Sequence, residues 1–362
     1  YSRTPAVPEH RPSPTPIPDP DPRRRSRTPI PDSILIPPSS TASTVPTRLV
    51  RTDSTLFRAF LHTLGLGLVL LGAAGCTPET DPETDGPRFT ATIPPLAMIA
   101  RPVVDGRARV TTLLEPGDSP HTYEPRPSDL RAVRNSDALL FGAPVLDGWA
   151  ADLPADRAWA LLDMVPPSHR RSLPAGHRHD AGDAPSVEVS APSTDPHFWT
   201  DPQAVQALLP ALVDSLCAVD AAGCEVYRAN ADTFATTLRQ LDERARTQLQ
   251  PVRHTPVMLS QPFFLYFMHR YGPDPVAVIE PIPGKEPSAR RIERLVRRAE
   301  TDSVQAIFSQ RQLPIRSTEA VAEAAEVPVH ALDPLGGRGD RTTYSALVLH
   351  NVEVVWEAVS ER

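Results

Sequence analysis

A stretch near the middle of the chain, residues 225–249, constrains the fold more than any other segment. Its apolar positions recur at helical spacing on one face, with charged residues opposite, which predicts a single amphipathic helix. These apolar positions are Tyr227, Phe234, Leu238 and Leu241. At 1.5 Å per residue such a helix runs roughly 37 Å, long enough to brace two lobes. We therefore expect a lobe on each side of this helix.

Short apolar runs alternate with helical patterns on both sides of the long helix. Before it, strands are predicted near 89–93, 109–114, 138–141 and 158–164, and helices near 94–104, 127–134, 146–150 and 202–219. After it, strands are predicted near 257–260, 276–279, 304–308 and 327–332, and helices near 262–271, 287–300, 317–326 and 344–359. This alternation is typical of parallel sheets flanked by helices. The predicted fold class is α/β, with two such lobes joined by one long rigid helix and a cleft between them.

The predicted boundaries are 88–222 for the first lobe, 223–250 for the connecting helix and 251–362 for the second lobe. The segment before them is not expected to join either lobe. Residues 1–47 are rich in Pro, Arg, Ser and Thr and have little to bury, which predicts disorder. Residues 77–87 are acidic and predict a flexible tether.

Between these two segments, residues 48–76 carry arginines followed by a short apolar run that ends in Ala-Ala-Gly-Cys. The pattern resembles a bacterial lipoprotein signal peptide, in which Cys76 receives the lipid and becomes the mature N-terminus. The alternative is an ordinary signal peptide with a chance cysteine. With the lipid, the folded part is expected in the periplasm or cell envelope, anchored to the membrane without spanning it.

Composition and net charge limit which partners and which kinds of chemistry are expected of this chain. The net charge is −7 and no basic stripe is present, so nucleic acid is not an expected partner. Cys217 and Cys224 lie seven positions apart between two helical stretches. In an exported protein this pair predicts a disulfide that pins the turn, with two buried thiols as the alternative. No nucleophile poised by a base and no glycine-rich phosphate loop is found, so catalysis is not expected.

Two histidines lie in short, polar, proline-bounded turns, each just before a helical pattern. The turns are residues 120–125, with His121, and 193–202, with His197. A histidine held in a stiff turn offers a neutral imidazole nitrogen, which suits a divalent transition metal. We therefore expect the two rings, 76 positions apart (197 − 121), to meet at one point between the lobes. The side chains expected to fix the rings by hydrogen bonds are Tyr123 and Glu124, beside His121, and Asp195 or Asp201, beside His197.

The order of five segments resembles the zinc/manganese class of periplasmic solute-binding proteins, the metal-capturing lipoproteins of ABC importers. The segments are the two histidine turns, LSQPFFLYF at 259–267, EPS at 286–288 and LDPLG at 332–336. The resemblance covers nearly all of residues 89–359. It implies two α/β lobes joined by one long helix, with the metal in the cleft.

The resemblance also implies the metal ligands. His121 and His197 match the two histidine ligands of the family, and Asp333 matches its carboxylate near the C-terminus. Asp333 follows a predicted strand, so it is expected at a carboxyl strand end facing the cleft. A carboxylate there would offset the charge of the cation. The alternative is that Asp333 is an Asx-Pro turn residue.

The fourth ligand position departs from the family. Where the family has histidine or glutamate, this chain has Gln261, whose amide oxygen is a weak, neutral ligand. Three outcomes stay open at this stage: Gln261 coordinates weakly, a water takes the place, or another group such as His254 or His269 does. The departure leaves the choice between Zn²⁺ and Mn²⁺ open as well.

The polar loop between the two turns holds His169, His177 and His179. Zinc-binding members of the resembling family often gather metal at low affinity in a His/Asp-rich loop there. An arginine between His177 and His179 repels a cation, so we interpret this loop as a solvated one, although it slightly favours zinc over manganese.

The function implied by the resemblance is the substrate-binding component of a metal ABC importer. It would capture a divalent transition metal, zinc rather than manganese, and deliver it as a monomer to the membrane permease. One alternative is an exported zinc hydrolase, with Glu124 or Glu280 as general base. A second alternative is a surface adhesin built on the same fold.

Overall fold

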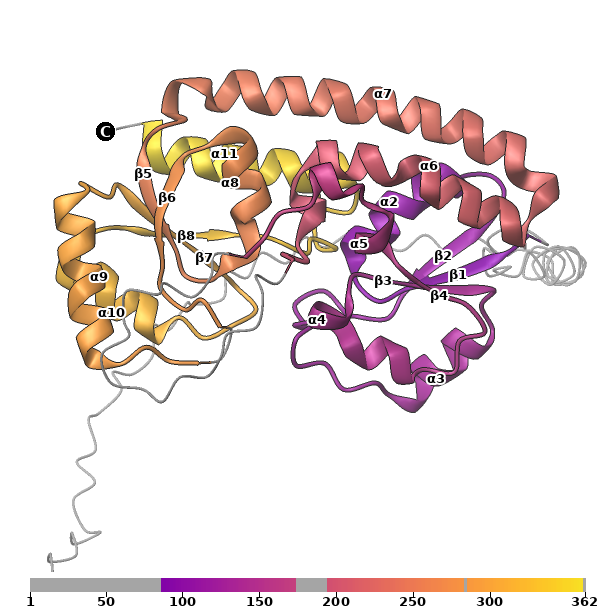
Figure 1. Cartoon of the computed structure of the whole chain (residues 1–362), viewed down its shortest axis with the longest axis horizontal. Coiled ribbons are helices and arrows are strands. Elements are labelled where there is room, and N and C mark those ends of the chain that lie inside the picture. Colours follow the sequence, from indigo (N-terminus) through magenta and orange to yellow (C-terminus); the bar gives the residue numbers. More distant parts are fainter. Residues whose placement is uncertain (1–85, 174–193, 283–284, 361–362) are drawn as a thin grey trace, which may run out of the picture. The chain divides into compact units, whose positions relative to one another are not determined.

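The computed structural model describes residues 86–173, 194–282 and 285–360. The segments expected to be disordered (1–47) and to be a signal peptide (48–76), with Cys76, lie outside these residues, as do most of the tether and both His177 and His179. The described part falls within one compact unit of the chain, which begins at Glu79. Figure 1 shows its helices and strands.

The first lobe holds a four-stranded sheet in the order β2-β1-β3-β4, with every neighbouring pair parallel. The strands are β1 (Arg88–Ala91), β2 (Arg109–Thr112), β3 (Ala138–Phe141) and β4 (Ala158–Ala160). The helices are α2 (Pro94–Val104), α3 (Pro127–Arg134), α4 (Pro144–Asp147), α5 (Leu161–Met164) and α6 (Pro202–Val219). All four residues of β3 are buried, as expected for a strand covered on both faces.

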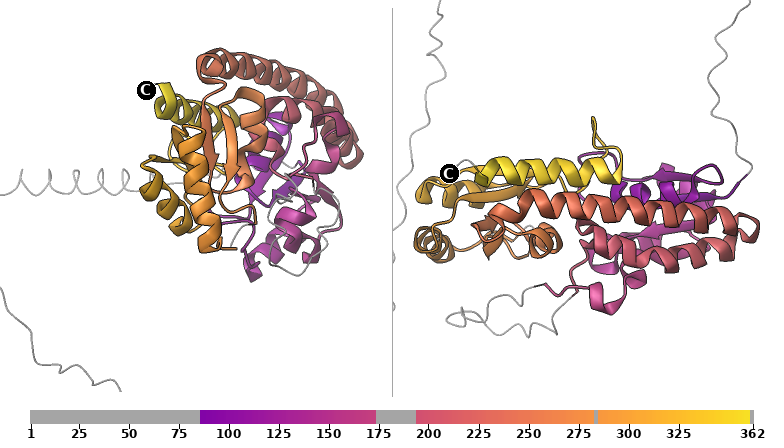
Figure 2. Two further views of the ribbon diagram at one scale, coloured as in Figure 1. Left: turned by 60° about the vertical axis from the view of Figure 1, so that its left-hand side comes forward. Right: turned by 90° about the horizontal axis from the view of Figure 1, so that it is seen from above.

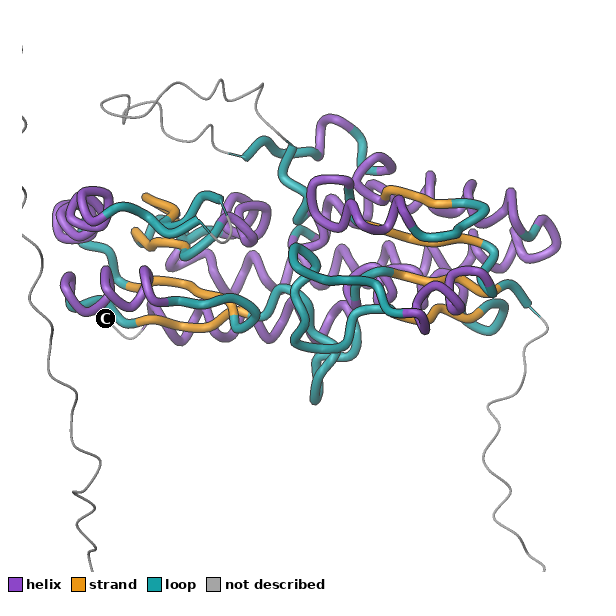
Figure 3. The backbone as a smooth tube through the Cα atoms, turned by 90° about the horizontal axis from the view of Figure 1, so that it is seen from below, coloured by secondary structure: helices purple, strands orange, loops and turns teal. Residues whose placement is uncertain are grey.

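The second lobe repeats this arrangement with a sheet in the order β6-β5-β7-β8, again all parallel. The strands are β5 (Pro256–Leu259), β6 (Asp274–Val278), β7 (Ala306–Gln310) and β8 (Val329–Leu332). The helices are α8 (Leu265–Tyr271), α9 (Ala289–Thr301), α10 (Arg316–Ala325) and α11 (Tyr344–Ser360). Figure 3 shows loops gathered between the two sets of strands.

The long helix α7 (Cys224–Leu249) joins the lobes, which confirms the predicted α/β fold. It packs against α6 and α2 of the first lobe and against α11 and α8 of the second, and Figure 2 shows α7 and α11 running alongside one another. Near its start, Asp220 accepts hydrogen bonds from Arg107 and from Tyr227. Cys217 and Cys224 form a disulfide across the turn between α6 and α7. The helix is therefore fixed at its first-lobe end.

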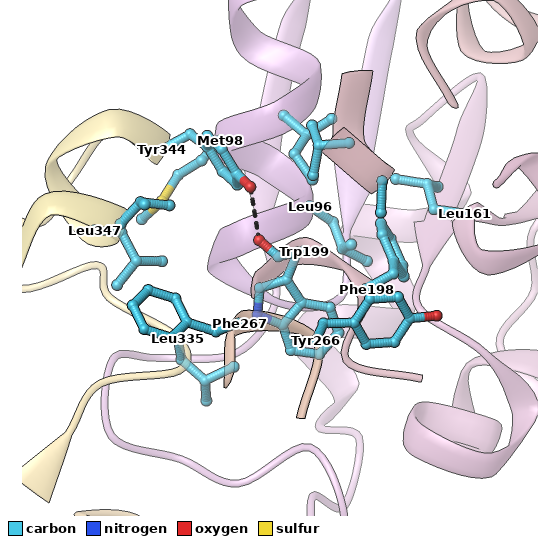
Figure 4. Packing of buried hydrophobic residues seen from close by; sticks show 14 of the residues in the cluster. Leu96, Met98, Leu161, Phe198, Trp199, Tyr266, Phe267, Leu335, Tyr344 and Leu347 are labelled. Carbon is cyan, nitrogen blue, oxygen red and sulfur yellow. Dashed lines mark hydrogen bonds between the residues drawn. The ribbon is translucent and has the colours of Figure 1, made fainter. Parts of the chain in front are cut away.

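The two lobes share one continuous hydrophobic core. Trp199, from the second histidine turn, is 1% exposed and donates its indole N–H to Pro334 O of the second lobe at 2.8 Å. Tyr344, at the start of α11, donates its hydroxyl to Trp199 O at 2.7 Å, as Figure 4 shows. These contacts tie the turn that carries His197 directly to the second lobe.

Two predicted elements differ from the structure. The strand expected over 158–164 ends at Ala160, and residues 161–164 form the short helix α5, which buries Leu161 and Leu162. The helix expected over 146–150 starts earlier, at Pro144, and tightens into a 3₁₀ turn from Gly148. Short apolar runs of this kind do not distinguish a strand end from a helical turn.

Candidate metal centre

His197 is held by the residue two positions before it. Asp195 is fully buried, and its Oδ1 accepts a hydrogen bond from His197 N at 2.9 Å and contacts His197 Nδ1 at 2.7 Å. Because a carboxylate only accepts, Nδ1 carries a proton, and in the neutral imidazole Nε2 is then the nitrogen with the lone pair. Asp201, the other expected partner, instead caps α6 by accepting from Gln203 N at 2.8 Å. Of the two aspartates, Asp195 is the one that orients the ring.

His121 lies in the loop that follows β2, with its ring centroid 5.9 Å from that of His197. Burial, and next the proximity of His197, lower the pKa of His121 to about 4, so the ring is neutral at neutral pH. Two imidazoles on one tetrahedral zinc ion, each with Zn–N about 2 Å, have centroids roughly 5–6 Å apart. The observed separation therefore suits two ligands of one cation.

The loop around His121 is fixed by bonds that do not involve its ring. Trp149 donates its indole N–H to Pro120 O at 2.9 Å, and Tyr123 donates its hydroxyl to Asp129 at 2.7 Å. Glu124, expected to orient His121, is exposed, and no hydrogen bond joins the two among the described residues. The stiffness of this turn comes from Trp149 and Tyr123.

Both histidines open onto a small pocket between the lobes. The first lobe lines it with Ser119, Pro120, His121, Leu146, His197 and Trp199. The second lobe lines it with Phe263, Gln310, Gln312, Pro334 and Leu335. Within residues 86–173, 194–282 and 285–360, no three His, Cys, Asp or Glu side chains come together as a metal-binding group. The groups facing the histidine pair from the second lobe are apolar side chains and two amides.

Asp333 follows β8, as expected, but within the described residues it forms no metal-binding group with the two histidines and does not line their pocket. Its Oδ2 accepts from Arg341 Nε at 2.8 Å, and its Oδ1 accepts from the backbone N–H groups of Leu335 and Gly336 at 3.1 and 2.9 Å. These bonds are those of an Asx turn, the alternative role that the sequence left open. Here Asp333 shapes the Pro334–Leu335 turn that lines the pocket.

Gln261 follows β5 but lies one layer behind the pocket. It is 2% exposed, its amide nitrogen donates to Glu280 Oε2 at 3.0 Å, and its amide oxygen accepts from Gln310 Nε2 at 2.6 Å. The other two histidines considered for the fourth position lie elsewhere. His254 and His269 line a separate cavity with Arg253 and Asp274. His169 ends a 3₁₀ turn and does not line the pocket.

The two amide side chains of the pocket were missed from the sequence. Gln310 ends β7, and Gln312 comes two residues later in the turn that follows. Their signal was their place at the carboxyl end of a buried strand, where ligands gather in parallel sheets. Glutamine is a common surface residue, so without the order of the strands this signal was not distinctive.

Comparison with known proteins identifies the relatives of this chain. A family model described as the periplasmic component A of the zinc-uptake complex matches residues 90–358. The high-affinity zinc uptake system protein ZnuA of Paracoccus denitrificans is 29% identical over 293 residues, which cover 74% of this chain and 90% of that protein. The manganese-binding lipoprotein MntA of Halalkalibacterium halodurans is 27% identical over 305 residues, covering 81% and 96%.

A solved structure shares the fold. The periplasmic zinc-binding protein TroA from Treponema pallidum superimposes with a TM-score of 0.62 at 22% identity, covering 75% of this chain and 99% of that one. The family model covers most of this chain and both of its lobes. The chain therefore belongs to the family of periplasmic component A proteins of the zinc-uptake complex.

Proposed function

We propose that this protein is the substrate-binding component of a metal ABC importer, which captures a divalent transition metal outside the cytoplasmic membrane. The observation that carries the proposal is the histidine pair. One ring is buried with its Nδ1 committed to Asp195, and the other is neutral because burial lowers its pKa. Both line one pocket between the lobes, where a bound cation touches both halves of the protein.

Zinc is the proposed substrate, ahead of manganese. The relatives carry both names, one as a zinc uptake protein and one as a manganese-binding lipoprotein. Two imidazole ligands favour zinc, because manganese prefers carboxylate, carbonyl and water oxygens. Within the described residues no carboxylate completes a metal-binding group of three with the two histidines, so nothing shifts this preference.

The proposal is tested by the metal that the protein selects. Protein purified from its own cell envelope is expected to contain about one equivalent of zinc by elemental analysis. In competition calorimetry, zinc should displace manganese from the loaded protein. Protein that contains no divalent metal and binds neither ion in vitro contradicts the proposed function.

We propose that the protein delivers the metal to a membrane permease, and membership in a family named for zinc uptake supports this. The family is periplasmic, so the protein acts outside the cytoplasmic membrane. We propose that it acts as a monomer, since both lobes that line the pocket come from one chain.

The proposed lipid anchor rests on the sequence of residues 48–76 alone. The variant Cys76→Ser is expected to move the protein from the membrane fraction to the soluble fraction, because the acceptor of the lipid is lost. Immunoblots of separated fractions measure the shift, and Ser54→Ala, a substitution within the same 48–76 segment, is the control. Retention of Cys76→Ser in the membrane fraction contradicts the anchor.

The hydrolase alternative has little support in the geometry. A catalytic zinc site needs a general base beside a metal-bound water. Of the two candidates, Glu124 is exposed, and Glu280 accepts a hydrogen bond from Gln261 behind the pocket. Neither lines the pocket, and the relatives are named for uptake and binding. The adhesin alternative has no residue in the described part that argues for it.

A further inference from the structure

Side-chain amides of the second lobe form a hydrogen-bonded chain that runs from a buried carboxylate to the histidine pocket. Glu280 accepts from Gln261, and Gln261 accepts from Gln310. All three side chains are more than nine-tenths buried. The sheet explains their alignment: Leu259 of β5 pairs with Phe308 of β7, so Gln261 and Gln310, each two residues further on, leave the sheet side by side.

The direction of this chain is fixed by the chemistry of its first member. A carboxylate only accepts hydrogen bonds, so Gln261 must turn its NH₂ toward Glu280 and its oxygen toward Gln310. Gln310 must then turn its own NH₂ toward Gln261. The end of the Gln310 amide that remains for the pocket is its oxygen.

A second amide side chain lines the same pocket. Gln312 lines it, and Gln312 Oε1 is buried with no hydrogen-bond partner. A buried oxygen without a partner is costly in a folded protein, and such atoms call for an unseen ligand or water. The second lobe therefore places two amides on the pocket that the two imidazoles of the first lobe line.

We propose that the second lobe completes the cation site with the amide oxygens of Gln310 and Gln312, and that Glu280 is the positioning residue that aims Gln310. This inference rests on the proposed function. It gives the two lobes the same design, because Asp195 stands behind His197 as Glu280 stands behind the amides. In each lobe the cation contacts neutral ligands, and the carboxylate, Asp195 or Glu280, contacts only those ligands. The cation is therefore held less tightly than by a directly bound carboxylate and is released more easily.

The first test removes the charge that sets the direction. In Glu280→Gln, Gln261 is free to turn over, and Gln310 can present its NH₂ to the cation. Zinc affinity measured by calorimetry is expected to fall about 10- to 100-fold, the usual effect of losing a group that orients a ligand. The control is Glu286→Gln, which removes the same charge from an exposed position. An affinity in Glu280→Gln equal to that of the control overturns the proposal.

The second test reverses the chain. In the double variant Glu280→Gln/Gln310→Glu, the carboxylate at position 310 accepts from the NH₂ of Gln261, and the oxygen of Gln261 accepts from the amide at position 280. The hydrogen bonds are complete again, and the carboxylate now lies beside the histidines. Zinc is expected to bind at least as tightly as to the wild type. If Glu280 merely stabilises the fold, the double variant binds no better than the single one, and the proposal fails.

The third test is independent of Glu280. Gln312→Met keeps the length of the side chain and replaces its amide, including the unpartnered oxygen, by a thioether, so the unfolding temperature should hold while zinc affinity falls at least about fivefold. Unchanged zinc affinity in Gln312→Met contradicts the role of Gln312 as a ligand. This test does not depend on whether Glu280→Gln folds. If the wild-type protein binds no divalent metal, the proposed function is wrong. If the wild type binds zinc and the variants bind it equally well, only the roles of Glu280, Gln310 and Gln312 are wrong.

Discussion

Replacement of His197 by alanine is expected to lower the affinity for zinc more than about 100-fold, because loss of a group that only orients a ligand already costs 10- to 100-fold. His197 is 6% exposed, and Asp195 leaves its Nε2 as the free lone pair of the ring. The smaller side chain offers the cation no donor, and water in its place binds more weakly than imidazole. Calorimetry in competition with a chelator of known affinity measures the loss.

The matched control is His254→Ala, which removes a histidine that is 83% exposed and lies away from the pocket. Its zinc affinity should equal that of the wild type. His121→Ala should behave like His197→Ala, since the two rings are 5.9 Å apart and are expected to share one ion. A folded His197→Ala protein with wild-type affinity would remove the pair from the metal site.

Much of the fold was predictable because its signals are local. Helix α6 begins at Pro202, directly after Asp201, whose side chain caps it, and the predicted and observed bounds agree. Helix α7 followed from its apolar face, and strand β3 from four apolar residues in a row. The element at 158–164 was wrong in its second half, because a run of apolar residues fits a strand and a buried helical turn equally well.

The candidate site, like the fold, was predictable where it depends on local sequence and not where it depends on distant contacts. His121 and His197 each lie in a short turn formed by neighbouring residues, so both histidines, and Asp195 as a partner of His197, could be predicted from the sequence. The surroundings of Gln261 depend on residues far along the chain, whereas those of Asp333 depend on the path of the loop after β8. Gln261 meets Gln310 because β5 and β7 are neighbours, and Asp333 meets Arg341 through the fold of the loop after β8. A single sequence states neither the order of the strands nor the path of an irregular loop, so neither contact was predictable.

The two lobes are also held together by hydrogen bonds to one buried aspartate. Asp242, on α7, is 6% exposed and accepts hydrogen bonds from Arg270 Nε at 2.8 Å and from the hydroxyl of Tyr271 at 2.9 Å. Both donors lie on α8 of the second lobe. Gln203 of α6, in the first lobe, donates to the same carboxylate at 3.3 Å. Asp242 thus joins the connecting helix to both lobes at once.

Replacement of Asp242 by alanine is expected to lower the free energy of unfolding by about 3 kcal/mol, the lower end of the range for breaking a buried ion pair. The lower end applies because the Arg270 side chain is 30% exposed and water can rehydrate it, whereas the Tyr271 hydroxyl stays buried without its acceptor. Urea unfolding followed by circular dichroism measures the change. The control is Asp232→Ala, an exposed position on the same helix, which should shift the free energy by less than about 0.5 kcal/mol. Equal stabilities of the two variants would show that α7 is held by its apolar face alone. The hydrogen bonds to Asp242 would then not contribute to fixing the lobes around the pocket.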